Sequence, residues 1–114
     1  MPSIYPFGNS GQWFKGQLHT HTTQSDGKVT PAESMRWHAE HGFHFIALTD
    51  HNRVTDPLQF LNPTPLLAIS SVEISARRGA IDYHVLAIGV KDMPIAQLND
   101  TQATIDAIEA AGGI

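Results

Sequence analysis

The 114-residue chain contains no cysteine, which excludes disulfide bonds and thiolate coordination of a metal ion. It has only seven Lys and Arg residues, which are scattered, against eleven Asp and Glu. The net charge of −4 therefore gives no electrostatic reason to expect a nucleic-acid or membrane partner. No apolar run approaches the roughly 20 residues of a membrane span, and residues 1–13 lack the basic start and apolar core of a signal peptide. These absences favour a soluble cytoplasmic protein of one domain, or a piece of one.

What the chain does contain is a set of histidines and carboxylates at the borders of apolar segments. His19 and His21 are one residue apart, and residues i and i+2 of an extended strand share a face, so both imidazoles can point at one metal ion. The other candidates are Asp26 in a Ser-Asp-Gly turn, His51 in a Thr-Asp-His run, Glu73 in an apolar segment and His84 at the start of another. This pattern predicts a polynuclear metal site with nitrogen and oxygen ligands, and such sites usually perform hydrolysis.

Each candidate also has a purely structural interpretation. His19 and His21 could be two partly exposed histidines at a strand end, and Asp50-His51 could be a helix-capping Asp and a surface His. Asp26 precedes Gly27, and Asp-Gly is a common turn dipeptide. His84 could be a hydrogen-bonded core histidine, and Glu73 could lie on an edge strand facing water. Burial of an unpaired carboxylate within the apolar run around Glu73 would be costly, which favours a functional role there.

Apolar segments predict strands over residues 13–19, 43–49, 66–75 and 84–90. Thr30-Pro31-Ala32-Glu33 is typical of a helix start, because Thr can cap, Pro fits the first position and Glu can close a capping box. We expect this helix to run to about His41 and end at Gly42, and a second to run from Asp100 or Thr101 to Ala111. Residues 77–80 suggest a hairpin-like connection, and residues 58–61 a short helical turn. Strands alternating with helices indicate an α/β sheet or barrel.

Together these motifs resemble those of the PHP family, named for polymerase and histidinol phosphatase, whose members are metal-dependent phosphoesterases. The resemblance runs from about residue 14 to residue 90. It rests on the His-x-His and Ser-Asp-Gly segment (19–27), Thr-Asp-His (49–51), Ser-Val-Glu-Ile-Ser (71–75) and His-Val-Leu-Ala-Ile-Gly (84–89). It implies an α/β fold that is the N-terminal part of a distorted PHP-type β/α barrel. It also implies up to three divalent ions, Zn, Mn or Fe, at the carboxyl ends of the strands.

The resemblance assigns six side chains to these ions: His19 and His21 to one, Asp26 and His51 to a second, and His84 to a third, with Glu73 bridging the first and the third. Asp50 would lie behind the ligands and orient a neighbour. Arg53, Arg77 and Arg78 are candidates for substrate contacts, because a guanidinium matches phosphate geometry. A solvated surface role is the alternative for all three arginines.

The expected function is hydrolysis of a small phosphorylated substrate by metal-bound hydroxide, without a covalent enzyme intermediate. The absence of cysteine and of a Gly-x-Ser-x-Gly turn supports the second point. One alternative is a related hydrolase that acts on nucleic-acid ends or on non-phosphate esters, although the acidic balance argues against long nucleic acid. The other is an incomplete, non-catalytic domain that binds metal.

Family members continue past the last helix with an Ala-His-Pro-like segment and an Asp-x-His pair that complete the metal shells, and neither occurs in these 114 residues. Gly112-Gly113-Ile114 is typical of a helix exit followed by the first residue of a strand without a partner. We therefore expect residues 1–114 to be the N-terminal portion of a PHP domain, with weak metal affinity and an open sheet edge that favours self-association.

Overall fold

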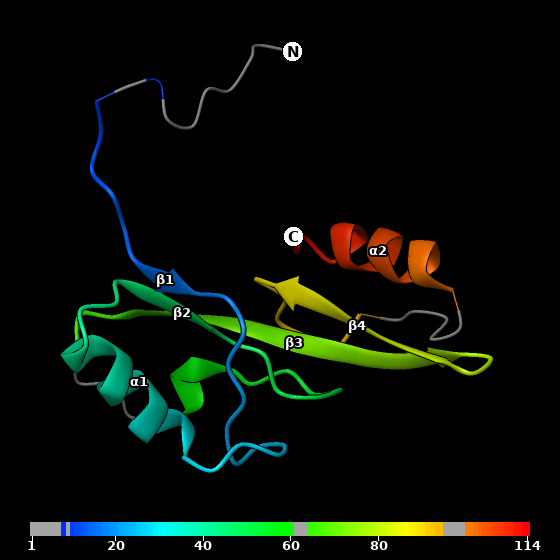
Figure 1. The fold of residues 1–114 in the computed structure, drawn as a ribbon, viewed down its shortest axis with the longest axis horizontal. Helices are drawn as coiled ribbons and strands as arrows, with labels where there is room; N and C mark the ends of the chain where they lie inside the picture. Colours follow the sequence, from blue (N-terminus) through cyan, green and yellow to red (C-terminus); the bar gives the residue numbers. More distant parts are fainter. Residues whose placement is uncertain (1–7, 9, 61–63, 95–99) are drawn as a thin grey trace.

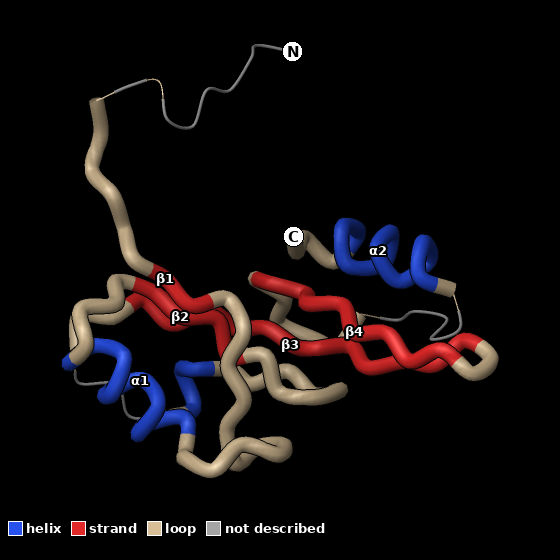
Figure 2. Tube along the Cα trace, in the orientation of Figure 1, coloured by secondary structure: helices blue, strands red, loops and turns tan. Residues whose placement is uncertain are grey.

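The computed structural model describes residues 8, 10–60, 64–94 and 100–114. Within these residues one mixed sheet has the strand order β1-β2-β3-β4 (Figure 1). Strands β1 (Gly16–Gln17), β2 (Phe45–Leu48) and β3 (Leu67–Arg78) are parallel, and β4 (Ile81–Ile88) is antiparallel to β3. Helix α1 (Pro31–Glu40) connects β1 to β2 and lies beside β2, whereas α2 (Thr101–Ala110) lies beside β4, as Figure 2 shows. The predicted α/β class is confirmed.

Helix α1 begins as the sequence predicts. The Thr30 hydroxyl accepts a hydrogen bond from the Glu33 backbone N–H (3.2 Å), and the Glu33 carboxylate accepts one from the Thr30 N–H (2.8 Å), which completes the capping box. The chain leaves the helix at Gly42, whose φ of +79° suits a residue without a side chain. No helix in the described ranges has the length and apolar content that crossing a bilayer requires.

Two apolar clusters hold the helices to the sheet. On the α1 side, buried Met35 packs with three residues of the sheet region, Ile46, Leu48 and Leu66. On the α2 side, Ile108 packs with Val72, Ile74, Ala87 and Val90. Because successive residues of a strand point to opposite faces, burial of the residues on either side of Glu73 against α2 places Glu73 itself on the other face.

The strands differ from prediction mainly at their ends. The predicted strand over residues 13–19 is wrong except at Gly16–Gln17, the two residues paired with β2. The ring of Phe45 lies so close to Gly16 that a Cβ there would meet it at 2.0 Å, and Trp13, Phe14 and Leu18 are exposed. Beyond this short strand the two segments stay joined by single backbone hydrogen bonds, from the His44 N–H to the Lys15 carbonyl (2.7 Å) and from the Thr49 N–H to the Thr20 carbonyl (2.9 Å).

The hairpin is longer than predicted. Strand β3 continues to Arg78 and β4 begins at Ile81, so the turn is only Gly79-Ala80, with Gly79 at φ +62°. As a result His84 lies inside a strand and not at its start, because it pairs with Ser75. The predicted helical turn near residues 58–61 is a 3-10 turn, η1, at Pro57–Gln59, and Leu61 lies outside the described residues.

Helix α2 is capped by Asp100, which accepts a hydrogen bond from the Ala103 N–H, close to the predicted start. The chain then turns at Gly112, φ +82°. The expectation that Ile114 lacks a partner is wrong, because Ile114 and Ile88 exchange both backbone hydrogen bonds (2.9 and 3.0 Å) in the antiparallel manner. Ile114 thus extends the sheet beyond β4.

Candidate metal centre

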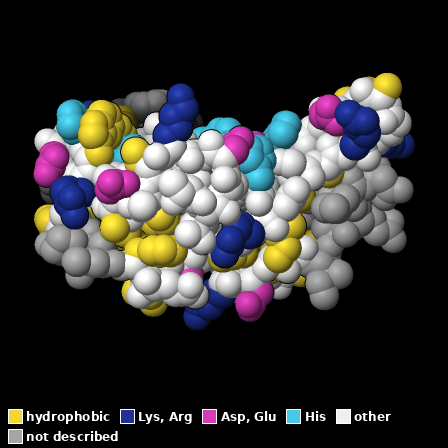
Figure 3. Space-filling model, turned by 90° about the horizontal axis from the view of Figure 1, so that it is seen from below, with side chains coloured by type: hydrophobic (Ala, Val, Ile, Leu, Met, Phe, Trp, Pro, Cys, Tyr) yellow, Lys and Arg dark blue, Asp and Glu magenta, His cyan; other side chains and the backbone are white. Residues whose placement is uncertain are grey.

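The structure brings all six candidate side chains into one site, where β2 has ended and β3 continues. Figure 3 shows histidine side chains gathered around acidic ones near the middle of the molecule's upper rim. The candidates form three overlapping groups whose potential ligand atoms lie within 4.8 Å of one another: His19, His21 and Glu73; His21, Asp26 and His51; and His51, Glu73 and His84. Their role as ligands stays a prediction, since the geometry gives only their placement.

The register of the sheet produces this convergence. Beyond β1 the chain stays alongside the segment after β2, because the Thr49 N–H donates to the Thr20 carbonyl (2.9 Å) and the Thr20 N–H to the Thr49 hydroxyl (2.8 Å). Beyond β2, His51 forms a parallel bridge with Glu73. The residues that follow β1 and β2 therefore lie close together, next to the part of β3 that extends past the end of β2.

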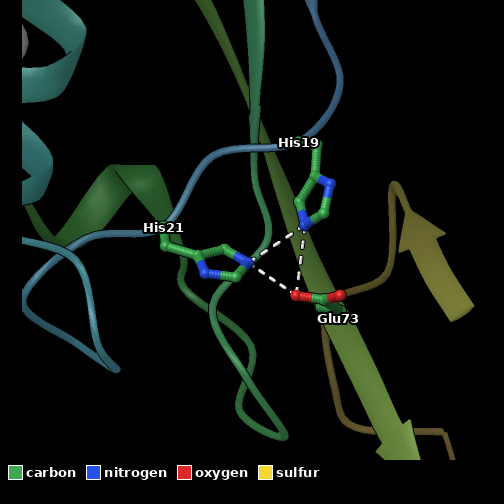
Figure 4. A group of neighbouring side chains, drawn as sticks. All are labelled: His19, His21 and Glu73. Carbon is green, nitrogen blue, oxygen red and sulfur yellow. Dashed lines mark hydrogen bonds and ion pairs between the residues drawn. The ribbon is translucent and has the colours of Figure 1, made fainter. Parts of the chain in front are cut away.

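The first group is the tightest. His19 Nε2 lies 3.1 Å from His21 Nε2, and Glu73 Oε2 lies 3.1 Å from the first and 2.5 Å from the second (Figure 4). These two nitrogens and one oxygen form a triangle, and three atoms in a triangle cannot all be joined by linear hydrogen bonds. One cation, in contrast, can contact all three. Metal–ligand bonds of about 2.0–2.2 Å place neighbouring ligand atoms roughly 3 Å apart. The donor set therefore fits a divalent ion.

The other two groups are looser and share residues with the first. His21 Nδ1 lies 2.9 Å from Asp26 Oδ1, and His51 Nε2 lies 3.3 Å from Asp26 Oδ2. Glu73 Oε1 lies 3.2 Å from His84 Nδ1, and Glu73 Oε2 lies 3.5 Å from His51 Nδ1. A neutral imidazole has one nitrogen lone pair, so His21 and His51 can each serve only one group at a time. The predicted assignment uses each imidazole once and is compatible with this limit.

Both site carboxylates favour the ionised form. Burial raises the pKa of Glu73, but the hydrogen bonds and positive charge of His19, with help from His21, lower it by more, so the pKa lies below its ordinary value. For Asp26, desolvation likewise raises the pKa, and attraction to His51 and the His21 hydrogen bond outweigh it. The site therefore presents two carboxylates ready to hold a cation.

Asp50 is fully buried and holds the loop that carries Asp26. Its carboxylate accepts hydrogen bonds from the Thr22 N–H (2.7 Å) and hydroxyl (2.8 Å), the Ser25 hydroxyl (2.6 Å) and the Thr55 hydroxyl (2.6 Å). Desolvation raises the pKa of Asp50, but these four donors lower it below its ordinary value. Sequence reasoning expected Asp50 to orient a neighbour, and its hydrogen bonds reach the segment between His21 and Asp26.

Sequence reasoning missed two residues that contact the candidates. The Ser75 hydroxyl lies 2.7 Å from His51 Nδ1 and 3.1 Å from His84 Nδ1. Asn52, at the uncommon φ of +50°, accepts a hydrogen bond from the Ser75 N–H (2.9 Å) and so fixes the turn after His51. A signal for Ser75 was available, since it is two residues from Glu73 and shares its face of β3.

The three candidate arginines are exposed, and they occupy different positions. Arg77 shares the face of Glu73 by strand alternation, whereas Arg78 belongs to the opposite face. The Arg77 guanidinium donates to both carboxylate oxygens of Asp82 (2.7 and 3.3 Å), and both residues line a cleft beside His84. Arg53 lies in the turn after His51. Substrate contact remains a prediction for all three.

Comparison with known proteins gives fold neighbours only. No protein-family model and no curated protein matches the chain. A two-domain protein of Bacteroides vulgatus, described as containing a predicted PHP-like metal-dependent phosphoesterase, matches 89% of the chain with a TM-score of 0.65 and 24% identity. A putative metal-dependent phosphoesterase of Bifidobacterium adolescentis matches 83%, with a TM-score of 0.56 and 22% identity.

A third neighbour is an amidohydrolase of Chromobacterium violaceum, solved with bound sulfate and no metal. It matches 85% of the chain with a TM-score of 0.54 and 19% identity. The chain spans 33%, 32% and 32% of these three proteins, about a third of each. At this identity the likeness concerns the fold alone, and the chain shares its fold with about a third of each of these proteins, two of which are described as PHP-like or metal-dependent phosphoesterases.

Proposed function

We propose that this chain forms the metal-binding part of a hydrolase that cleaves phosphate esters. The observation that carries the proposal is Glu73, whose side chain is only 4% exposed. Its Oε2 atom faces His19, His21 and His51, and its Oε1 atom faces His84. A buried carboxylate with this arrangement can hold two cations close together. Divalent ions such as Zn, Mn or Fe would supply Lewis acidity and lower the pKa of a bound water.

The chain's own residues divide the remaining work. His19 and His21 present nitrogen atoms on one side of Glu73, and His84 presents one on the other. Asp26 is 66% exposed, so it can meet an ion from the solvent side while Asp50 holds its loop in place. The cleft beside His84 gives a small phosphorylated substrate access from the hairpin, with Arg77 at its edge.

Metal binding by the purified 114-residue chain is the first test. We expect Mn²⁺ or Zn²⁺ to bind in calorimetric titration, and Glu73→Gln to weaken the tightest binding by at least about tenfold, the loss typical when a ligand or its supporting group is changed. Glu40→Gln is the matched control, because Glu40 is an exposed residue at the end of α1. Unchanged binding by Glu73→Gln would contradict the proposal.

Activity separates the candidate reactions. We expect phosphate-ester hydrolysis that chelation abolishes and Mn²⁺ or Zn²⁺ restores, measured on the chain and on any longer form that contains it. The amidohydrolase neighbour favours one second candidate, hydrolysis of an amide or non-phosphate ester, so an anilide substrate belongs in the same assay. Activity that survives exhaustive chelation would rule out the metal-dependent mechanism. Metal binding without turnover on either substrate would support the non-catalytic alternative.

A further inference from the structure

The segment that follows β2 stays paired with β3 for a few residues after β2 has ended. The Glu73 N–H donates to the Asp50 carbonyl (3.0 Å), and the Asn52 N–H donates to the Glu73 carbonyl (2.9 Å). These two hydrogen bonds enclose the parallel bridge between His51 and Glu73. In a regular parallel ladder, the next hydrogen bond would run from the Ser75 N–H to the backbone carbonyl of residue 52.

The side chain of Asn52 takes the place of that backbone carbonyl. The Ser75 N–H donates to Asn52 Oδ1 (2.9 Å). A backbone N–H can only donate a hydrogen bond, so the side-chain atom that faces it must be the amide oxygen and not the amide nitrogen. The pairing of β3 with the residues after β2 is therefore one hydrogen bond longer than the backbone alone makes it.

The backbone conformation of Asn52 explains why a side chain is needed here. Among the residues that the structure describes, Asn52 is the only one besides glycines with a positive φ, +50°. The chain leaves the extended path at this residue, and Thr55 then forms an antiparallel bridge with Ser71. Asparagine tolerates a left-handed conformation better than most residues, and its short side chain can bond to nearby backbone groups. Glycine would suit the same φ but would offer no oxygen.

We propose that Asn52 is a positioning residue for His51, a role that rests on the proposed metal site. Asn52 is joined to β3 at two points, the Glu73 carbonyl and the Ser75 N–H. Both points belong to residues whose side chains contact the imidazole, since His51 Nδ1 lies 2.7 Å from Ser75 Oγ and 3.5 Å from Glu73 Oε2. The hydrogen bond to Ser75 thus holds the turn after His51 against β3 and keeps the other ring nitrogen 3.3 Å from Asp26 Oδ2.

Amide hydrogen exchange in the ¹⁵N-labelled, metal-free chain tests this contact. Asn52→Gly keeps the positive φ and removes the side-chain oxygen. We expect the Ser75 amide to exchange at least about fivefold faster in this variant, the factor expected from the loss of one ordinary hydrogen bond. The intrinsic exchange rate stays the same, because the sequence neighbours of Ser75 are unchanged. Asn52→Asp keeps an acceptor oxygen at this place and should preserve the slow exchange.

The amide of Leu67 is the internal control for this measurement. It donates to the His44 carbonyl (3.0 Å) at the opposite end of the β2–β3 pairing, and its exchange should not change in Asn52→Gly. An equal acceleration at Leu67 and Ser75 would overturn the proposal, because the variant would then have lost stability as a whole. Unchanged exchange at Ser75 would also overturn it, because Asn52 would then serve the turn alone.

Zn²⁺ binding tests whether the contact positions His51. In calorimetric titration Asn52→Gly should bind Zn²⁺ roughly tenfold more weakly than the unmodified chain, the loss typical for a residue that supports a ligand. Faster exchange at Ser75 with unchanged Zn²⁺ affinity would overturn the positioning role. Absence of Zn²⁺ binding in the unmodified chain would instead count against the proposed function, and with it against any role of Asn52 in metal binding. The two failures are distinguishable, because amide exchange is measured without metal.

Discussion

Asp50 illustrates how one buried side chain can determine the position of another. Its carboxylate accepts four hydrogen bonds from the loop and turn around the site. An asparagine has the same shape but only one acceptor oxygen, so Asp50→Asn leaves buried donors without partners. We expect it to lower the free energy of unfolding by about 3 kcal/mol, measured by urea denaturation.

The matched control for this substitution is Asp106→Asn. Asp106 is exposed on α2 and accepts a single side-chain hydrogen bond from Gln102. Its replacement should change the free energy of unfolding by less than about 0.5 kcal/mol. Equal effects of the two substitutions would show that the hydrogen bonds of Asp50 do not carry the stability assigned to them.

The lowered pKa values of Asp50 and Glu73 predict a stability that depends on pH. In the unfolded chain these carboxyls protonate near their ordinary pKa values of about 3.9 and 4.3. Because the folded-state values are lower, the stabilisation is complete above this range and is lost as the pH falls through the folded-state pKa values. We expect the urea concentration at the unfolding midpoint of the metal-free chain to decrease as the pH is lowered below about 4. The decrease should be smaller in Asp50→Asn, because one of the two carboxyls is then absent.

For single residues, the sequence predicts the histidines and carboxylates of the site better than it predicts the hydroxyl groups. His19 and His21 were found because strand alternation puts them on one face, and Glu73 because a lone carboxylate in an apolar run needs a partner. Ser75 is marked only by its spacing of two from Glu73, and Thr22 gives no signal of its own, since a hydroxyl is common anywhere on a strand or loop. Their roles depend on which segments the register brings together, and that is a property of the fold.

Among the elements, β3 decides the geometry of the site because it is longer than its parallel neighbours. Only Leu67–Ser70 pair with β2, and the rest of the strand carries the site on one face and apolar residues on the other. The apolar run of the sequence ends near Ser75, which is why the predicted strand ends there. The alternation of polar Glu73, Ser75 and Arg77 with apolar neighbours continues further, and period-2 spacing is the better guide to this strand's end.

The loop from Thr22 to Gly27 is the second element on which the site depends. The Gly27 N–H donates to the Thr22 carbonyl (2.9 Å), and a Cβ at Gly27 would lie 2.4 Å from the His21 carbonyl oxygen and 2.6 Å from the Thr22 nitrogen. These are backbone atoms, so Gly27→Ala must displace the loop. We expect a loss of about 2 kcal/mol in the free energy of unfolding and weaker Mn²⁺ binding, both measured on the purified chain.

Gly11→Ala is the control, because a Cβ at Gly11 would meet nothing within 4 Å. It should leave both the stability and the Mn²⁺ affinity unchanged. If Gly27→Ala loses stability and yet binds Mn²⁺ as tightly as the unmodified chain, the loop position does not control the second group of ligands.

For the whole molecule, the arrangement of sheet edges matters as much as the site. In the described residues β1 pairs with β2 over only two residues, and the outer edge of β4 is paired at Ile88 through Ile114. An apolar cleft near β1 is lined in part by Phe14, Phe43 and Leu67, and Phe14 and Leu67 are 60% and 62% exposed. The fold neighbours are about three times as long as this chain. These two surfaces are places where the sheet of the described residues has an edge that another strand could join.

Unpaired strand edges present backbone groups that can pair with another chain. We therefore predict that the isolated chain self-associates through the outer edge of β4, where Ile81 is 69% exposed at the hairpin end. Lysine at such an edge opposes pairing, so Ile81→Lys should shift the mass measured by light scattering toward the monomer. Leu58→Lys adds the same charge at a 91% exposed position in η1 and should leave association unchanged. A monomer mass at every protein concentration would contradict the prediction. Equal effects of both substitutions would mean that association follows net charge, with no role for the β4 edge.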